Sequence, residues 1–134
     1  MPVGEIMGAV LFILDAPEKV ALDDGRIQVL RQSLGDQRCR EIIAEVVFHL
    51  TDRLTLLNAA LSAGERAEAR ALASRLAGLA EQVGLVRFAQ VARDLRDCLR
   101  AGDPIAEAAI SARLGRLAES SLCGVMRHAD PAAI

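Results

Sequence analysis

From about Arg26 onward, apolar residues recur at the three- and four-residue spacing of an α-helix. Glycine, aspartate or proline interrupts this pattern wherever it stops or restarts. Five helical segments are expected between the interruptions, over about 26–34, 36–63, 65–83, 86–101 and from 103–104 to just before 124. A strand-like alternation has little support in the chain. The sequence therefore predicts an all-α protein.

The ends of these segments carry known helix signals. Asp36 is placed to cap the second segment and Gly64 to end it, while Asp103 followed by Pro104 predicts a capped helix with proline at its first position. Short connections make neighbouring helices antiparallel, so we expect an up-down-up-down four-helix bundle with a short extra helix before it. The second segment has the longest apolar stripe, formed by Ile42, Ile43, Val46, Val47, Leu50, Leu54, Leu57 and Leu61.

The expected organisation is an N-terminal arm over 1–24, the bundle over 25–124 and a tail without helical period over 125–134. The arm includes an apolar stretch, 6–14, whose nine residues are too few to cross a bilayer, since a helix needs about 20. It also lacks the basic start and the cleavage site of a signal peptide. We therefore expect a cytoplasmic protein in which this stretch packs on its own bundle or joins two copies into a homodimer.

Composition excludes several classes of function. The 134 residues suit one domain, and 16 basic against 18 acidic residues, with no Trp or Tyr, disfavour nucleic-acid binding. Three cysteines without CxxC spacing predict neither a disulfide framework nor a zinc site. No metal, cofactor, phosphate-binding glycine loop or nucleophile elbow is indicated. Imidazole chemistry is limited to two residues, His49 and His128.

The third segment has an unusual outward face. At about 100° per residue, its apolar side gathers Ala69, Leu72, Leu76, Leu79 and Val83, and its other side gathers Ala67, Arg70, Ala71, Ser74, Ala77, Gly78 and Glu81. Four of these seven outward residues are alanine or glycine, and a mid-helix glycine costs about 1 kcal/mol relative to alanine. This face is either a surface for close approach of a partner or a chance result of an alanine-rich chain.

The stretch 73–78, Ala-Ser-Arg-Leu-Ala-Gly, followed by Gly84, resembles the signature of the histidine-containing phosphotransfer (HPt) domain, Ala-His-x-Leu-Lys-Gly and then a glycine. The resemblance extends over about 23–122, which is most of the chain. It implies an antiparallel four-helix bundle of a bacterial two-component phosphorelay. In that family the signature helix presents one residue to the receiver domain of a response regulator or to a histidine kinase.

The chain departs from this family pattern at three positions. Ser74 stands where the family has its phospho-accepting histidine, Ala77 stands where it has lysine, and Leu79 stands where it usually has a small or polar residue. A serine hydroxyl needs a base to become a nucleophile, and Glu81 lies seven residues along, about 10 Å up the helix. The resemblance thus predicts a non-enzymatic adaptor or inhibitor that docks a receiver or kinase. Its predicted contact residues are Arg70, Ser74, Ala77, Gly78 and Glu81.

Two alternatives remain open at the level of sequence. One is an active phosphotransfer protein with a non-standard acceptor, His49 on the second segment or His128 in the tail. The other is a structural helical homo-oligomer in which the alanine-rich face and the stretch 6–14 pack against a second copy.

Overall fold

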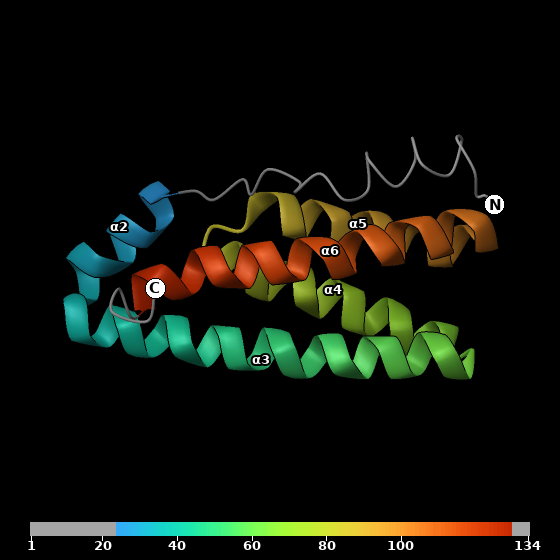
Figure 1. The fold of residues 1–134 in the computed structure, drawn as a ribbon, viewed down its shortest axis with the longest axis horizontal. Helices are drawn as coiled ribbons and strands as arrows, with labels where there is room; N and C mark the ends of the chain where they lie inside the picture. The colour runs from blue at the N-terminus through green and yellow to red at the C-terminus, as the bar shows by residue number, and fades with distance from the viewer. Residues whose placement is uncertain (1–23, 130–134) are drawn as a thin grey trace, which may run out of the picture.

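The computed structural model describes residues 24–129, and every regular element within them is a helix (Figure 1). The helices are α2 (Asp24–Leu34), α3 (Asp36–Ala63), α4 (Arg66–Gln82), α5 (Val86–Ala101) and α6 (Pro104–Ala129). The prediction of an all-α fold is confirmed for this part of the chain. The expected second and fourth segments coincide with α3 and α5 at both ends.

The four long helices form a closed ring of neighbours. α3 contacts α4 and α6, and α5 likewise contacts α4 and α6. In Figure 1 the chain doubles back at each turn between these helices. The short helix α2 packs against α3, at the end where α3 begins.

Two of the turns depend on glycine in the left-handed region. Gly64 has φ 73°, and the N–H of the next residue, Glu65, donates to the carbonyl of Ala60 at 2.9 Å. Gly102 has φ 75°, and its own N–H donates to the carbonyl of Cys98 at 2.9 Å. Residues with a Cβ disfavour this conformation, so glycine ends α3 and α5 here.

The start of α6 follows the sequence signal, whereas the start of α3 does not. Asp103 Oδ1 accepts a hydrogen bond from the N–H of Ala106 at 3.1 Å, with Pro104 as the first helical residue, which confirms the predicted cap. Asp36 is instead the first residue of α3, and Gly35 holds the cap position with no side-chain hydrogen bond. Asp36 pairs with Arg31 of α2 at 3.5 Å.

The expected end of the last helix before Gly124 is wrong. α6 continues to Ala129, and Val125 is fully buried in the core. Burial of that side chain outweighs the cost of about 1 kcal/mol for a glycine inside a helix. Residues 125–129 of the expected tail are therefore helical. The stretch 6–14, the rest of the expected arm before Asp24, and residues 130–134 lie outside the described residues.

The core lies inside the ring of helices, and its largest fully buried side chain is Phe88 of α5. Every position of the predicted α3 stripe is either buried in this core or packed at its margin, as expected of an amphipathic helix. The buried members are Ile43, Val46, Leu50 and Leu57, and the marginal ones are Ile42, Val47, Leu54 and Leu61. Among the residues searched, no helix has the length and apolar character that crossing a bilayer would demand.

One arginine connects three helices at the end of the bundle where α4 begins. Arg66 Nη2 donates to the carbonyl of Leu99 in α5 at 2.7 Å. Its Nη1 and Nη2 also donate to the two carboxylate oxygens of Glu107 in α6, at 2.9 and 2.5 Å. The hydrogen bonds to this carboxylate raise the pKa of the Arg66 guanidinium. Arg66 therefore fixes α4 against both of the helices that follow it.

Candidate docking surface on α4

The outward face of α4 carries a line of small residues, here named the α4 strip and formed by Ala67, Ala71, Ser74 and Gly78. Ala67, Ser74 and Gly78 are exposed, and Ala71 is half-buried. They recur three or four residues apart, so they share one side of the helix. All four side chains along the strip are small, which allows a partner to approach the helix closely there.

Ala77 does not belong to this surface. The prediction that it faces outward is wrong, because only 4% of it is exposed and it belongs to the core cluster. It lies about 60° around the helix from Ser74, on the flank of α4 that turns inward. An alanine at this place allows α4 to pack closely, so its small size serves the bundle itself.

The charged residues predicted for the site differ in their partners. Glu81 is exposed, but its carboxylate forms an ion pair with Arg93 of α5. Its charge therefore joins two helices of the bundle. Arg70 is half-buried and Arg75 is exposed, and neither side chain has a hydrogen bond or an ion pair within residues 24–129. The unengaged charges beside Ser74 are thus both positive.

Gly78 is not required by the bundle. It lies within α4 without a positive φ, and a Cβ built on it would meet no atom within 4 Å. Gly115 of α6 has the same freedom around it. Neither backbone strain nor internal packing therefore explains a glycine in the middle of the α4 strip.

The surroundings of Ser74 supply no activating group. Its hydroxyl has no hydrogen-bond partner in the described part of the chain, and the nearest predicted base, Glu81, is engaged by Arg93. No group of His, Cys, Asp and Glu residues able to hold a metal ion occurs among the residues searched. The α4 strip can be contacted by a partner, but its serine is not prepared to act as a nucleophile.

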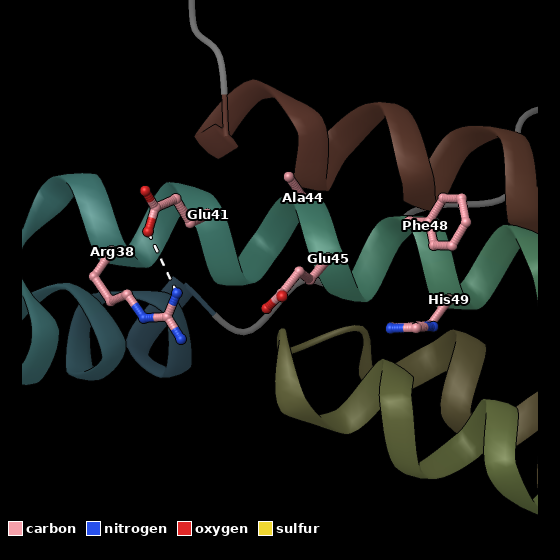
Figure 2. Close-up of a pocket in the computed structure, with 6 residues that line it drawn as sticks. All are labelled: Arg38, Glu41, Ala44, Glu45, Phe48 and His49. Carbon is pink, nitrogen blue, oxygen red and sulfur yellow. Dashed lines mark hydrogen bonds and ion pairs between the residues drawn. The ribbon is translucent and has the colours of Figure 1, made fainter.

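A second feature, on α3, was missed by the sequence reasoning. A shallow depression of about 510 Å³ is lined by Arg38, Glu41, Ala44, Glu45, Phe48 and His49 (Figure 2). Phe48 is 68% exposed, and its ring meets that of His49 edge to face, with the centroids 5.5 Å apart. The available signal was an aromatic residue outside the apolar stripe, in a chain that is only 2% aromatic.

The charges of this depression are unequally engaged. Glu41 accepts hydrogen bonds from Gln37 at 3.2 Å and from Arg38 at 3.3 Å, and these lower the pKa of its carboxyl group. Glu45, by contrast, has no ion pair within the described residues. Figure 2 shows the imidazole of His49 directed toward α4. His128 falls in α6, and its side chain is outside the description.

Comparison with known proteins places these features in a family. The profile of the Hpt domain matches residues 41–122, from the first part of α3 well into α6. A solved structure similar to this chain is that of histidine-containing phosphotransfer protein B (HptB) from Pseudomonas aeruginosa PAO1. The TM-score is 0.76 at 22% identity, over 83% of this chain and 96% of that one. No curated protein gives a significant match. The chain therefore belongs to the Hpt domain family, whose members are phosphotransfer modules that interact with response regulators and kinases in phosphorelays.

Proposed function

We propose that this protein is an HPt-like module of a bacterial two-component phosphorelay that docks a receiver domain or a histidine kinase without accepting phosphate. It would act in the cytoplasm, as an adaptor or an inhibitor, on an antiparallel up-down-up-down bundle preceded by one short helix. The observation that carries the proposal is the exposure of Ser74 on α4. By its resemblance to the family signature, the stretch 73–78 puts this serine where the signature has its histidine. Ala77, at the lysine position of that motif, is buried.

The chemistry around Ser74 supports docking without transfer. An imidazole is largely neutral at pH 7 and forms a phosphoramidate that passes its phosphoryl group onward, whereas a serine hydroxyl needs a base to attack. Glu81 is held by Arg93 and no other partner touches the hydroxyl within residues 24–129. The surface that a partner would contact is retained while the reacting group is absent.

We assign different roles to the five residues expected at the contact. We keep Arg70, Ser74 and Gly78 as the centre of the contact, because they are accessible on one face of α4. Ala77 would act from beneath, by letting α4 pack closely, and Glu81 would act by holding α4 to α5 through Arg93. Rim charges such as Arg70 affect the association rate and specificity more than the affinity.

The docking test uses two glycines in equivalent environments. Gly78→Arg places a long side chain on the α4 strip, and Gly115→Arg places the same one on α6, where a Cβ also meets no atom within 4 Å. With the purified receiver domains and histidine kinase of the source organism, Gly78→Arg should abolish binding, and Gly115→Arg should bind like the wild type. Both should keep the helical circular dichroism. Wild-type binding by the Gly78→Arg protein would refute docking through α4.

The phosphate test compares the wild type with Ser74→His. Incubated with a labelled phospho-receiver or kinase, the wild type should acquire no acid-labile, base-stable label, and Ser74→His should acquire one because it restores an imidazole at the exposed position. The second candidate, transfer through His49, is favoured only by the exposure of that residue. Label on the wild type that disappears in His49→Ala would establish this second candidate and overturn the adaptor.

The arm over 1–24 and a homodimer through the stretch 6–14 also remain proposals, because residues 1–23 lie outside the described part and Asp24 already belongs to α2. Light scattering of the full chain and of a variant beginning near residue 22 separates the possibilities. If both proteins have the molar mass of a monomer, the arm is excluded as a dimer contact.

A further inference from the structure

A groove of about 230 Å³ separates α5 from α6 near the start of α5. Its lining consists of Val86, Arg87, Gln90, Val91 and Asp94 of α5 with Arg113 of α6. The flank of α6 that carries Arg113 is otherwise made, at helical spacing, of the small residues Ala106, Ala109, Ser120 and Gly124. A further segment of chain can therefore approach both helices closely at this groove.

The chain before α2 leaves the described structure beside this groove. Arg26, in the first turn of α2, donates from Nε to the carbonyl of Gln82 at 3.3 Å. Gln82 is the last residue of α4, four residues before α5 begins at Val86. Figure 1 shows the first, blue turn of α2 on the same side of the bundle as the start of α5. The residues that precede Asp24 therefore extend from a point next to the groove.

The length of the preceding chain allows the apolar stretch 6–14 to lie on this groove. Residues 15–23 connect the stretch to Asp24, and nine extended residues reach about 30 Å. The stretch itself would span about 14 Å as a helix. Because α5 has 16 residues, it is about 24 Å long. The connection can thus bring the stretch to any level along α5.

The composition of the stretch 6–14 favours its burial. Its sequence is Ile-Met-Gly-Ala-Val-Leu-Phe-Ile-Leu, with no charged residue and no polar side chain. Large apolar side chains gain free energy when they leave water, and contiguous exposed apolar surface marks an interaction site. The stretch therefore needs an apolar surface to cover it.

Charge favours the groove between α5 and α6 over the depression on α3. Glu5 and Asp15 border the stretch, so both of its ends are acidic. The charged residues that line the groove are two arginines and one aspartate, whereas those that line the α3 depression are two glutamates and one arginine. The groove between α5 and α6 attracts the acidic ends, and the α3 depression repels them.

We propose that the stretch 6–14 packs over the groove between α5 and α6 of its own chain and places apolar side chains in it. The short connection holds the stretch at a local concentration on the order of 1 mM, which favours its own bundle over a second copy in micromolar solution. In the ring of helices, the α5–α6 pair lies across from the α3–α4 pair, so the α4 strip stays uncovered. The inference goes beyond the proposed docking function and does not depend on it.

The test compares the backbone amide NMR signals of the full-length wild type with those of Phe12→Asp and Phe12→Leu. Phe12→Asp should release the stretch, because an ionised carboxylate is costly to bury in an apolar contact. The signals of Gln90 and Arg113 should then shift, while those of Ser74 and Gly78 on α4 should not. Phe12→Leu keeps the side chain apolar, so its signals at Gln90 and Arg113 should stay close to those of the wild type.

Two further measurements complete the test. Light scattering at the concentration used for NMR should give the molar mass of a monomer for the wild type and both variants. Hydrogen exchange of the wild type needs no substitution, and the amides of 6–14 should exchange at least about tenfold more slowly than those of an unstructured peptide.

The outcomes distinguish the possible positions of the stretch. Unchanged signals at Gln90 and Arg113 in Phe12→Asp, or exchange of 6–14 at the rate of an unstructured peptide, would overturn packing in the groove. A dimeric wild type that Phe12→Asp converts to a monomer would assign the stretch to a homodimer contact and overturn the inference as well. Docking through α4 is tested separately by Gly78→Arg, so the two proposals can fail independently.

Discussion

At the scale of the residue, two glycines on either side of the start of α4 have opposite requirements. Gly64 has φ 73°, where a side chain introduces strain. Gly78 has an ordinary helical backbone and open space around the position of a Cβ. The first glycine serves the fold. Gly78 reduces the stability of the helix, and no packing contact within the bundle requires it. Such a glycine suits a surface that a partner approaches closely.

The two residues can be compared by substitution with alanine. Gly78→Ala should raise the free energy of unfolding by about 1 kcal/mol, because alanine loses less backbone entropy in a helix and meets no atom. Gly64→Ala should lower it by about 1 kcal/mol or more, because alanine disfavours the left-handed conformation. Urea unfolding followed by circular dichroism measures both changes. A destabilising Gly78→Ala would mean that the bundle needs this glycine after all.

Sequence reasoning at this scale succeeded for side chains deep in a stripe and failed at its edges. The buried side of α4 was predicted correctly for Ala69, Leu72 and Leu76. Ala77 was misplaced because a position about 60° from the exposed centre can belong to either side, and only the approach of neighbouring helices decides. Phe48 was not singled out as a surface residue. Helical periodicity identifies the apolar residues that lie within a stripe, and it gives no information on an apolar residue outside the stripe.

At the scale of the element, α4 is held by ionic contacts at both ends. Arg66 joins its first turn to α5 and α6, and Glu81 joins its last turn to Arg93 of α5. The region between them carries the α4 strip, so the helix is held in place by contacts that lie outside the strip. Helix periodicity could not predict either contact, because both depend on which helices become neighbours.

A double-mutant cycle tests the contact at the start of α4. Arg66→Ala and Glu107→Gln should each lower the urea midpoint, and the double variant should lose less than the sum of the two, because the partners share two hydrogen bonds across helices. The reference pair is Arg38 with Glu41, an exposed contact within α3, for which coupling should be much smaller. Equal coupling in the two pairs would show that the Arg66 contact does not link the helices energetically.

At the scale of the whole molecule, the chain order of the helices and the all-α class followed from periodicity and glycine signals. The extent of the bundle did not. Gly124 looked like an end signal, yet Val125 is fully buried and α6 continues to Ala129. The burial of Val125 in the core outweighs the tendency of Gly124 to end the helix. The stretch after Gly124 is too short for a periodic pattern to reveal this contact. The family match likewise ends at residue 122.

This extension of the bundle can be measured with two valines. Val125→Ala should lower the free energy of unfolding by about 2 kcal/mol, the value of a fully buried valine side chain. Val86→Ala, at the start of α5, removes the same atoms from a side chain that is 45% exposed, and should change stability by roughly 0.5 kcal/mol or less. Similar effects of the two substitutions would place residue 125 outside the cooperative unit.

The closed ring of helices has a consequence for the order of assembly. Each of the pairs α3 with α4, α4 with α5, and α5 with α6 is adjacent in the chain, so their contacts form by closing short loops. Only the contact of α3 with α6 joins elements separated by two intervening helices. The entropic cost of closing a loop rises with the logarithm of loop length, so the contact between α3 and α6 has the highest cost of the four. Folding is therefore expected to proceed by helical hairpins and to finish when α6 closes on α3, with the rapid kinetics typical of low contact order.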